Sequence, residues 1–457
     1  MDQPNIILIV LDTLRKDVLP MYGGNAYTPN LNEFAKDAVV FPNAIAPSPW
    51  TVPSHMSFFT GKYAIEHSVH EDNEMIFGNN IDKKVSEYSG KLFWEILNNK
   101  GYNTLSFSAN PYISPDSGFN KNWNYIRSNF IYYPINYENI IEEYIGYGKK
   151  TSKMFLNFSK KGDLKSILRY LNTYRNVKKY LKINNFPLLK GSNLIINDII
   201  NSYVEEPFFI FLNFMEVHEP LTNYEMHRDI IGLHYLDLLG LKKIPKNKIN
   251  LIKNNYIKAL RNLDEQIGFL IKFFKNKKIY DDPLIIVTSD HGQALKESRR
   301  FSYYGHGNFL YNELIEVPLI IKFPKNKKIQ IKKGYQSLVK IPDLIFNTLE
   351  DNILDYVTSE VVFSESYGTF QDLKRLTKLR ILPKSVDIEK IKSTIFYPRK
   401  AVYKNDYKLV INGLYGDIDE FLYKGKEIKP EDNKEVLEDL LNELDIFKGT
   451  EKFVVRK

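Results

Sequence analysis

The segment PLIIVTSDHGQ, residues 283–293, places a run of apolar and β-branched residues directly before an aspartate, a histidine and a glycine. Short apolar runs of this kind are typical of buried strands. Asp290 and His291 follow the predicted strand 283–288, where a carboxylate and an imidazole suit zinc, manganese or magnesium ions. A second interpretation is that Asp290 only caps the next element. Gly292 is expected to let the chain turn sharply after the pair.

Similar apolar runs recur along the chain and alternate with segments of helical spacing. Strands separated by helices favour an α/β fold, built on a large, mostly parallel sheet that helices cover on both faces. The other predicted strands are residues 5–11, 208–214, 318–323 and 361–364, and the predicted helices include residues 91–100 and 255–275.

Polar side chains follow the predicted strands at the points where the strands end. Asp12 follows the first predicted strand, and Glu216 and His218 follow the second. Because ligands bind beyond the carboxyl ends of parallel strands, we expect these groups to share one site with Asp290 and His291. Asp12 taken alone also fits the ordinary role of a helix N-cap.

The chain divides into three parts by composition. We predict an α/β catalytic domain over residues 1–367, a basic helical insertion near residues 125–195, and a small C-terminal α+β subdomain over residues 368–457. Residues 145–195 hold twelve lysines and arginines against one acidic residue, Asp163. This basic segment fits a solvent-exposed insertion, and it also fits a cap that attracts an anionic substrate.

Composition excludes several kinds of protein. The 457 residues include no cysteine, which rules out disulfides, thiolate metal sites and cysteine nucleophiles. Hydrophobic residues make up 43% of the chain, enough for a sizeable core. The net charge of +8 suits anionic partners without indicating nucleic-acid binding. No apolar run is long enough for a membrane span and no basic flank marks a signal peptide, so we expect a soluble, cytoplasmic protein.

The segment SPWTVPSHMSFFTGKY, residues 48–63, raises the question of a nucleophile. A hydroxyl at the start of a predicted helix, here Thr51, is normally a cap. The same helix N-terminus also favours a phosphate or sulfate group. If a metal held by Asp12, Asp290 and His291 touched the Thr51 oxygen, it would lower the hydroxyl pKa and create a nucleophile. The residues alone leave both roles open.

Three further polar residues are candidates for the site. His218 follows a predicted strand, and His306 lies in the glycine-flanked sequence YYGHGNF. Either imidazole could protonate a leaving group or stabilise transition-state charge. Asn73, in EDNEM, could donate to a phosphoryl oxygen, although asparagine in a polar loop is often a turn residue.

Five motifs occur in one order along the chain. They are PNIILIVLDTLRKD (4–17), WTVPSHMSFFTGKYAIEH (50–67), FLNFMEVHEP (211–220), LIIVTSDHG (284–292) and GHGNFLYNELIEVPLIIKFP (305–324). This order resembles the alkaline phosphatase superfamily, and within it the sulfatase-like branch. The resemblance covers most of the chain and is weakest over residues 124–194.

The resemblance implies roles for the candidate residues. Asp12, Asp290 and His291 would ligate one divalent metal, with zinc or manganese favoured and calcium or magnesium possible. Thr51 would be both a ligand and the nucleophile. His55 falls where sulfatases carry the arginine of their cysteine/serine–x–proline–x–arginine signature.

The sequence departs from sulfatases at several of these positions. His306 falls where many sulfatases carry a lysine. Thr51 replaces the cysteine or serine that is oxidised to formylglycine, and in this it resembles relatives that pass through a phospho-threonine. These relatives are nucleotide pyrophosphatase/phosphodiesterases, phosphoethanolamine transferases and phosphoglycerol transferases. Thr13 and Phe214 stand where other members carry metal-binding aspartates, so one metal is expected.

The expected activity is metal-dependent cleavage of an anionic ester. Thr51 would attack phosphorus, His218 or His306 would assist the leaving group, and His55 and Asn73 would stabilise the equatorial oxygens. A phosphodiester or phosphonate monoester is the preferred substrate class. The alternatives are a sulfatase, a phosphoglycerol- or phosphoethanolamine-type transferase, and a catalytically silent anion-binding protein.

Overall fold

A computed structural model gives the fold. It describes residues 3–70, 81–113, 117–119, 123–128, 189–202, 204–297, 303–327, 329–331, 333–350, 358–368, 397–412 and 416–448.

The centre of the protein is a seven-stranded sheet in the order β2-β10-β7-β1-β6-β4-β5. β1 pairs in parallel with β6 and β7, and β4 pairs in parallel with β5 and β6. β10 and β2 complete one edge in antiparallel orientation. The strands are β1 (Ile6–Leu11), β2 (Val39–Val40), β4 (Asn103–Ser108), β5 (Tyr125–Ser128), β6 (Phe208–Phe214), β7 (Leu284–Thr288) and β10 (Leu319–Lys322).

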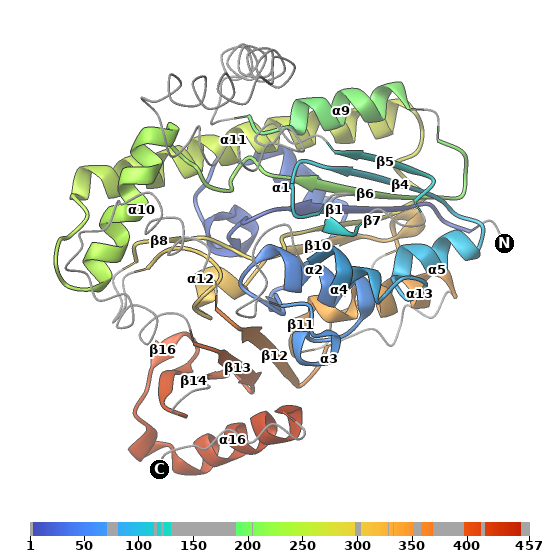
Figure 1. Ribbon diagram of the computed structural model, residues 1–457. Coiled ribbons are helices and arrows are strands. Elements are labelled where there is room, and N and C mark those ends of the chain that lie inside the picture. The colour runs from blue at the N-terminus through green and yellow to red at the C-terminus, as the bar shows by residue number, and fades with distance from the viewer. Residues whose placement is uncertain are drawn as a thin grey trace, which may run out of the picture.

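Helices cover both faces of this sheet (Figure 1). One layer contains α1 (Pro29–Lys36), α9 (Ser192–Asn201) and α11 (Lys246–Asn276), and the other contains α2 (Thr51–Thr60), α5 (Phe93–Asn99) and α13 (Ile341–Leu349). The three central strands β1, β6 and β7 are buried along their whole length, as expected for parallel strands packed on both sides. The predicted α/β architecture is therefore confirmed.

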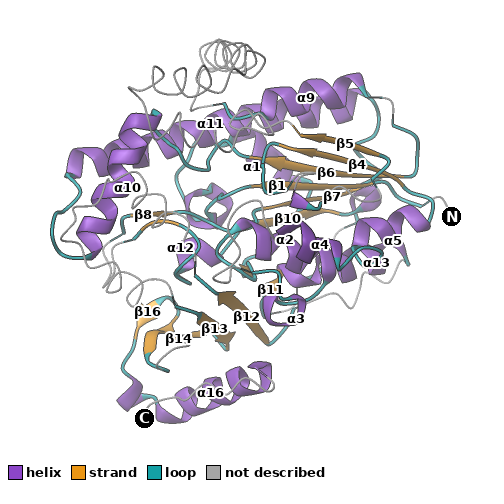
Figure 2. Ribbon diagram, viewed as in Figure 1, coloured by secondary structure: helices purple, strands orange, loops and turns teal. Residues whose placement is uncertain are grey.

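Further helices and short strands lie around the main sheet and its helices (Figure 2). They are β3 (Ala44–Ile45), α3 (Ala64–His67), α4 (Ile81–Ser86), α10 (Tyr224–Leu238), β8 (Ala294–Leu295), β9 (Tyr304–Gly305), α12 (Asn312–Ile315) and β11 (Gln336–Ser337). Among the described helices, none combines the length and apolar character needed to cross a membrane.

A separate antiparallel sheet forms the C-terminal part. It contains β12 (Val361–Ser366), β13 (Arg399–Lys404), β14 (Tyr407–Asn412), β15 (Ile418–Tyr423) and β16 (Lys426–Glu427), and α16 (Lys434–Lys448) packs on it. β12 pairs with β13 and not with the main sheet. The C-terminal sheet thus begins at Val361, a few residues before the boundary at 368 that we predicted.

This C-terminal sheet is fixed to the loop that follows β9. The Arg399 guanidinium and the Lys408 ammonium donate to main-chain carbonyls of Asn308 and Leu310. Lys408 also pairs with Glu420 at 2.7 Å within the sheet. Both cations are buried, and buried charges persist only when they are paired in this way.

Candidate active site

Asp12 lies at the carboxyl end of β1 and its side chain is fully buried. The next residue, Thr13, has φ of 61°, in the left-handed region that a β-branched residue rarely adopts. Tyr256 of α11 holds this turn, because its hydroxyl donates to the Thr13 carbonyl and accepts from the Arg15 N–H, each at 2.9 Å. Such strain persists where the surroundings enforce it, often at functional sites.

Asp290 and His291 follow β7, the neighbour of β1, and are also fully buried. Gly292 does not have the positive φ that our sharp-turn interpretation implied. Its role is to leave room, since a Cβ there would lie 2.0 Å from the Glu313 carbonyl oxygen. The Gly292 N–H donates to the Leu314 carbonyl at 2.8 Å, which brings the two segments together.

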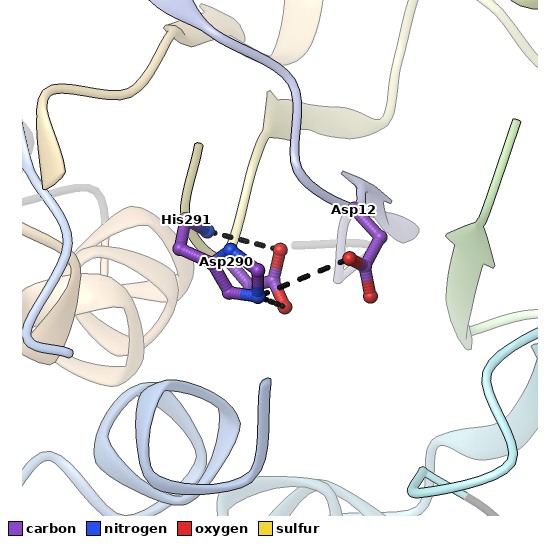
Figure 3. Close-up of side chains that lie close together, drawn as sticks. All are labelled: Asp12, Asp290 and His291. Carbon is purple, nitrogen blue, oxygen red and sulfur yellow. Dashed lines mark hydrogen bonds and ion pairs between the residues drawn. The ribbon is translucent and has the colours of Figure 1, made fainter. Parts of the chain in front are cut away.

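The three residues converge on one point (Figure 3). Asp12, Asp290 and His291 each offer a ligand atom within 4.8 Å of the other two. The His291 Nε2 atom lies 3.4 Å from Asp290 Oδ2 and 3.9 Å from Asp12 Oδ1. Among the described residues, neither of these two buried carboxylate oxygens has a hydrogen-bond donor.

The chemistry of these atoms fits a cation. The His291 Nδ1–H group faces the Gly292 carbonyl at 2.9 Å, so Nε2 carries the lone pair of the neutral ring. Burial lowers the pKa of His291 to about 4, which keeps that ring neutral at pH 7. A lone pair and two carboxylate oxygens thus face one another, and a divalent metal would satisfy all three.

Burial also shifts the pKa values of the two carboxyl groups of the cluster. Burial, followed by the charge of Asp290, raises the pKa of Asp12 well above its ordinary value. Burial also raises the pKa of Asp290. Two buried carboxylates of this kind are costly without a cation, so the residues present fit a metal site.

Thr51 is the first residue of α2, and its hydroxyl points into this cluster. Its Oγ1 atom lies 3.4 Å from His291 Nε2 and 3.5 Å from Asp12 Oδ2. Of the two roles that the sequence left open, the capping role is wrong, because the N-cap residue is Trp50 and no side-chain hydrogen bond caps this helix end. The hydroxyl is therefore free of a capping bond and lies beside the candidate metal ligands.

Asn110 belongs to the site and was missed from the sequence. It follows β4, and its Nδ2 atom donates to Asp12 Oδ2 at 2.6 Å and lies 3.4 Å from Thr51 Oγ1. Its Oδ1 atom accepts the Tyr112 N–H at 2.8 Å, which fixes the orientation of the amide. The carboxyl-end rule would have found Asn110 if β4 had been among the predicted strands.

Replacing Asn110 by alanine is expected to lower metal affinity and turnover by about 10- to 100-fold each, as is usual for a partner of a metal ligand. Asp12 Oδ2 would lose its shortest hydrogen bond. Calorimetric titration with Mn²⁺ and steady-state kinetics measure the two effects. Unchanged affinity and turnover in Asn110→Ala would show that Asp12 needs no such support.

His55 lies one helical turn after Thr51 and is fully buried. Its Nδ1 atom faces the Thr51 carbonyl at 2.9 Å and Asp290 Oδ2 at 3.5 Å, and its Nε2 atom accepts from Asn213 Nδ2 at 3.2 Å. Both ring nitrogens are thus engaged by the protein. Burial lowers the pKa of His55 to about 4, so the neutral ring supports Thr51 and Asp290 from behind.

His218 and His306 lie together at the partly exposed side of the site. Their rings are 4.9 Å apart, and the His306 ring is 4.6 Å from that of His291. The His218 Nδ1 atom faces the Glu219 carbonyl at 2.5 Å, and that of His306 faces Gln293 Oε1 at 2.9 Å. Each ring therefore keeps its Nε2 atom available.

The environment of these two imidazoles keeps them neutral. Burial lowers the pKa of His218 to about 3 and that of His306 well below its ordinary value, with neighbouring histidines adding to the effect. An anionic group beside the two rings would raise their pKa values.

Two predictions fall outside the described residues. Asn73 lies in the segment 71–80, and most of the basic insertion lies in 129–188, so neither is placed by the structure. The structure does describe Thr13 and Phe214, the two residues that stand where related proteins carry metal-binding aspartates. The Thr13 Oγ1 atom is buried without a hydrogen-bond partner among the described residues, and Phe214 ends β6 inside the core.

Acid is expected to destabilise the protein through its buried neutral histidines. Burial lowers the pKa of His67 to about 3, whereas an unfolded histidine titrates near 6.5. As pH falls from about 6.5 towards 3, only the unfolded chain takes up this proton, so unfolding becomes easier by about 1.4 kcal/mol per pH unit. Denaturant unfolding at pH 7 and pH 5 measures the loss.

His67→Gln is the matched variant for this measurement, since glutamine can still donate to the Ser57 hydroxyl that lies 3.0 Å from His67 Nε2. In this variant the difference between the two pH values should shrink by about 2 kcal/mol. An unchanged difference would contradict the neutral buried state of His67.

Comparisons with known proteins point to one protein family. Residues 4–350 match the sequence model of the family described as Sulfatase. An N-acetylglucosamine-6-O-sulfatase of Bacteroides thetaiotaomicron is 24% identical over 71% of this chain and 63% of its own length. An arylsulfatase of Clostridium perfringens is 24% identical over 76% of this chain and 74% of its own length.

The chain is shorter than several of these relatives. It spans 61% of an ulvan-active sulfatase of Formosa agariphila, to which it is 23% identical over 75% of its own length.

Solved structures share the fold at low sequence identity. A phosphonate monoester hydrolase of Agrobacterium radiobacter superposes with a TM-score of 0.60 at 14% identity, over 97% of this chain and 95% of that chain. A protein solved with its substrate D-glucosamine-2-N,6-O-disulfate gives a TM-score of 0.59 at 15% identity, over 98% and 97%. These likenesses concern the fold.

Proposed function

Because the chain belongs to the sulfatase family, we propose that it is a metal-dependent hydrolase that cleaves phosphodiesters or phosphonate monoesters through a covalent intermediate on Thr51. The observation that carries this proposal is the position of the Thr51 hydroxyl, which lies within 3.5 Å of both Asp12 and His291 and makes no capping bond.

Asp12, Asp290 and His291 would hold one divalent ion, with Thr51 completing the set. Zinc or manganese suits this mixture of carboxylate and imidazole, and calcium or magnesium is the alternative. When bound, the ion would lower the pKa of the hydroxyl and neutralise charge on the transferred group. Phe214 supplies no ligand at the end of β6, which supports one ion and not two.

The residue type at position 51 supports phosphoryl chemistry. Threonine carries its hydroxyl on a secondary carbon, so oxidation would give a ketone and not the aldehyde of formylglycine. An intact threonine hydroxyl can attack phosphorus directly. The Oγ1 proton passes to solvent water, the bond from Oγ1 to phosphorus forms as the bond to the leaving oxygen breaks, and the first alcohol departs.

Protein groups around the nucleophile would stabilise this step. The Asn110 amide, the N–H groups at the start of α2 and the side chain of Asn73 are our candidates for donors to the equatorial oxygens. His55 would act through Thr51 and Asp290, since both of its ring nitrogens already engage the protein. His55 is thus a positioning residue in this scheme.

His218 and His306 would serve the leaving group. Both rings are neutral in the free site, and a bound anionic ester raises their pKa by its charge, so the substrate itself favours the acid form. The protonated Nε2 then gives its proton to the departing oxygen. Water, or an acceptor hydroxyl in a transferase, would resolve the ester on Thr51.

The test is a panel of four aryl substrates with Mn²⁺ or Zn²⁺: a phosphodiester, a phosphonate monoester, a phosphomonoester and a sulfate ester. We expect the first two to be cleaved and Thr51→Ala to lose that activity. Sulfate as the one good substrate would overturn the phosphoryl assignment in favour of a sulfatase. No turnover with metal bound would favour a transferase, and no metal binding at all would favour an anion-binding protein.

A further inference from the structure

Lys190 is a buried cation at the end of the basic segment, two residues before α9. Its side chain is fully buried, unlike the solvent-exposed lysines that we expected in this segment. Burial lowers the pKa of Lys190 to about 7, and the charges of Glu216, Glu219 and Asp12 act in the opposite direction. Lys190 therefore differs from an ordinary surface lysine in both its burial and its titration.

Lys190 and Glu216 hold each other through main-chain groups. The Lys190 ammonium donates to the Glu216 carbonyl at 2.7 Å and also to the His218 carbonyl. The Glu216 carboxylate accepts the N–H of Lys190 at 2.9 Å and that of Ser192 at 3.0 Å. We name these four hydrogen bonds the Lys190–Glu216 clamp.

The clamp acts on the loop that carries His218. This loop follows β6, and the other hydrogen bonds of His218 itself are local: its N–H donates to the Met215 carbonyl at 3.1 Å, and its Nδ1 atom faces the Glu219 carbonyl. From outside the loop, the Gln293 amide also donates to the Glu219 carboxylate at 3.3 Å. The clamp is buried, so removing the ammonium would leave the main-chain carbonyls of Glu216 and His218 without this donor, while the Glu216 carboxylate would keep the N–H groups of Lys190 and Ser192. Buried polar groups that lose their partners are costly, and this cost would draw the loop towards water.

We propose that Lys190 is a positioning residue that fixes the His218 imidazole against the leaving group, through its hydrogen bonds to the carbonyls of His218 and Glu216. The inference rests on the proposed function, in which His218 serves the departing alcohol. Lys190 itself touches no reacting atom in this scheme.

This role has a specific kinetic consequence. As the phosphorus–oxygen bond breaks, the electron pair passes to the leaving oxygen and the proton comes from His218 Nε2. A poor leaving group such as an alkoxide needs that proton, whereas a nitrophenolate does not. A displaced His218 should therefore slow poor leaving groups much more than good ones.

The experiment compares kcat/KM over a series of esters with graded leaving-group pKa, taken from the class that the wild-type protein cleaves. The variants are His218→Ala, Lys190→Met, the double variant and Lys190→Arg, in the full chain loaded with Mn²⁺. We expect Lys190→Met to cost about 100-fold for the poorest leaving group and less than about tenfold for the best. Lys190→Arg, which keeps the donors, should recover part of the loss.

Lys322→Met is the matched control. Lys322 is also a buried lysine whose ammonium donates to a main-chain carbonyl, that of Asp281 at 2.7 Å, but it lies in β10 opposite Ile285, near the start of β7 and not at its carboxyl end. The Lys322→Met change should lower thermal stability without changing the leaving-group dependence. Should Lys190→Met fail to fold, Glu216→Gln weakens the same clamp from its other partner and replaces it in the series.

The double variant distinguishes the positioning role of Lys190 from the leaving-group role of His218. If Lys190 acts through His218, its removal costs nothing further once His218 is alanine. A loss that is equal for all leaving groups, or that adds fully to that of His218→Ala, would overturn the role of Lys190. If His218→Ala lowered kcat/KM equally for all leaving groups, the proposed leaving-group role of His218 would be overturned instead. The double variant would still decide whether Lys190 acts through His218.

Discussion

Thr51→Ala should lower kcat/KM for the best substrate by at least about 10³-fold, because removal of a nucleophile leaves only binding and electrostatic stabilisation. The fold should tolerate the change, since the Thr51 hydroxyl makes no contact shorter than 3.4 Å among the described residues. Steady-state kinetics and thermal unfolding of the same preparation measure the two quantities.

Two variants make this result specific to the hydroxyl of Thr51. Thr51→Ser keeps a hydroxyl at the start of α2 and should retain activity within about tenfold of the wild type. Thr60→Ala removes a hydroxyl at the other end of the same helix, where it donates to the Met56 carbonyl at 2.6 Å, and should leave kcat/KM unchanged. If Thr51→Ala kept most of the activity, the nucleophile would be water or another group.

Asp290→Asn should produce a protein that is more stable without metal and nearly inactive with it. The change removes one of two buried carboxylates that raise each other's free energy, so the metal-free protein gains stability. It also removes an anionic ligand, so turnover should fall by about 100-fold or more. The stabilisation by excess Mn²⁺, about 2.7 kcal/mol at 100 times Kd for the wild type, should disappear.

Asp264→Asn is the matched control for this prediction. Asp264 is also a buried carboxylate with a raised pKa, but it accepts the N–H groups of Asn30 and Leu31 at the start of α1. Its replacement should lower stability and leave the Mn²⁺ effect intact. If Asp290→Asn kept the full metal-induced stabilisation, the cation site would not include Asp290.

The central strands and the polar residues at their carboxyl ends were predictable because their signals are local. The run 208–214 is β6 to the residue, and β1 and β7 begin one residue after the predicted starts at Asn5 and Pro283. In a parallel sheet the carboxyl ends of neighbouring strands meet at one edge, which is why Asp12, Asp290 and His291 gather although 278 positions separate the first two.

Other parts of the site depend on contacts that no local pattern encodes. Asn110 follows the run NTLSFS, whose polar residues interrupt the continuous apolar run by which the other central strands were predicted, yet that run is β4 in the core. Lys190 ends a basic segment and is nevertheless buried, because the main-chain carbonyls of Glu216 and His218, in a loop distant in sequence, accept hydrogen bonds from its ammonium. In both cases tertiary contacts overrode the local preference.

The cap interpretation of Thr51 failed for a related reason. A threonine at the start of a helix is often the N-cap, but the helix here begins one residue earlier than that role requires. With Trp50 as the N-cap, the hydroxyl is directed to Asp12 and His291. The exact first residue of the helix decided which role was available, and sequence patterns locate helix ends only to within a few residues.

The most direct test of the central claim is to trap the intermediate. The wild-type protein, loaded with Mn²⁺, is mixed with an aryl phosphodiester, quenched in acid within one turnover and digested for peptide mass spectrometry. The account predicts that the peptide containing Thr51 gains the mass of the substituted phosphoryl group, with fragment ions that place it on Thr51. Burst release of the aryl alcohol, with that peptide unmodified and the phosphoryl group on another residue, would contradict it.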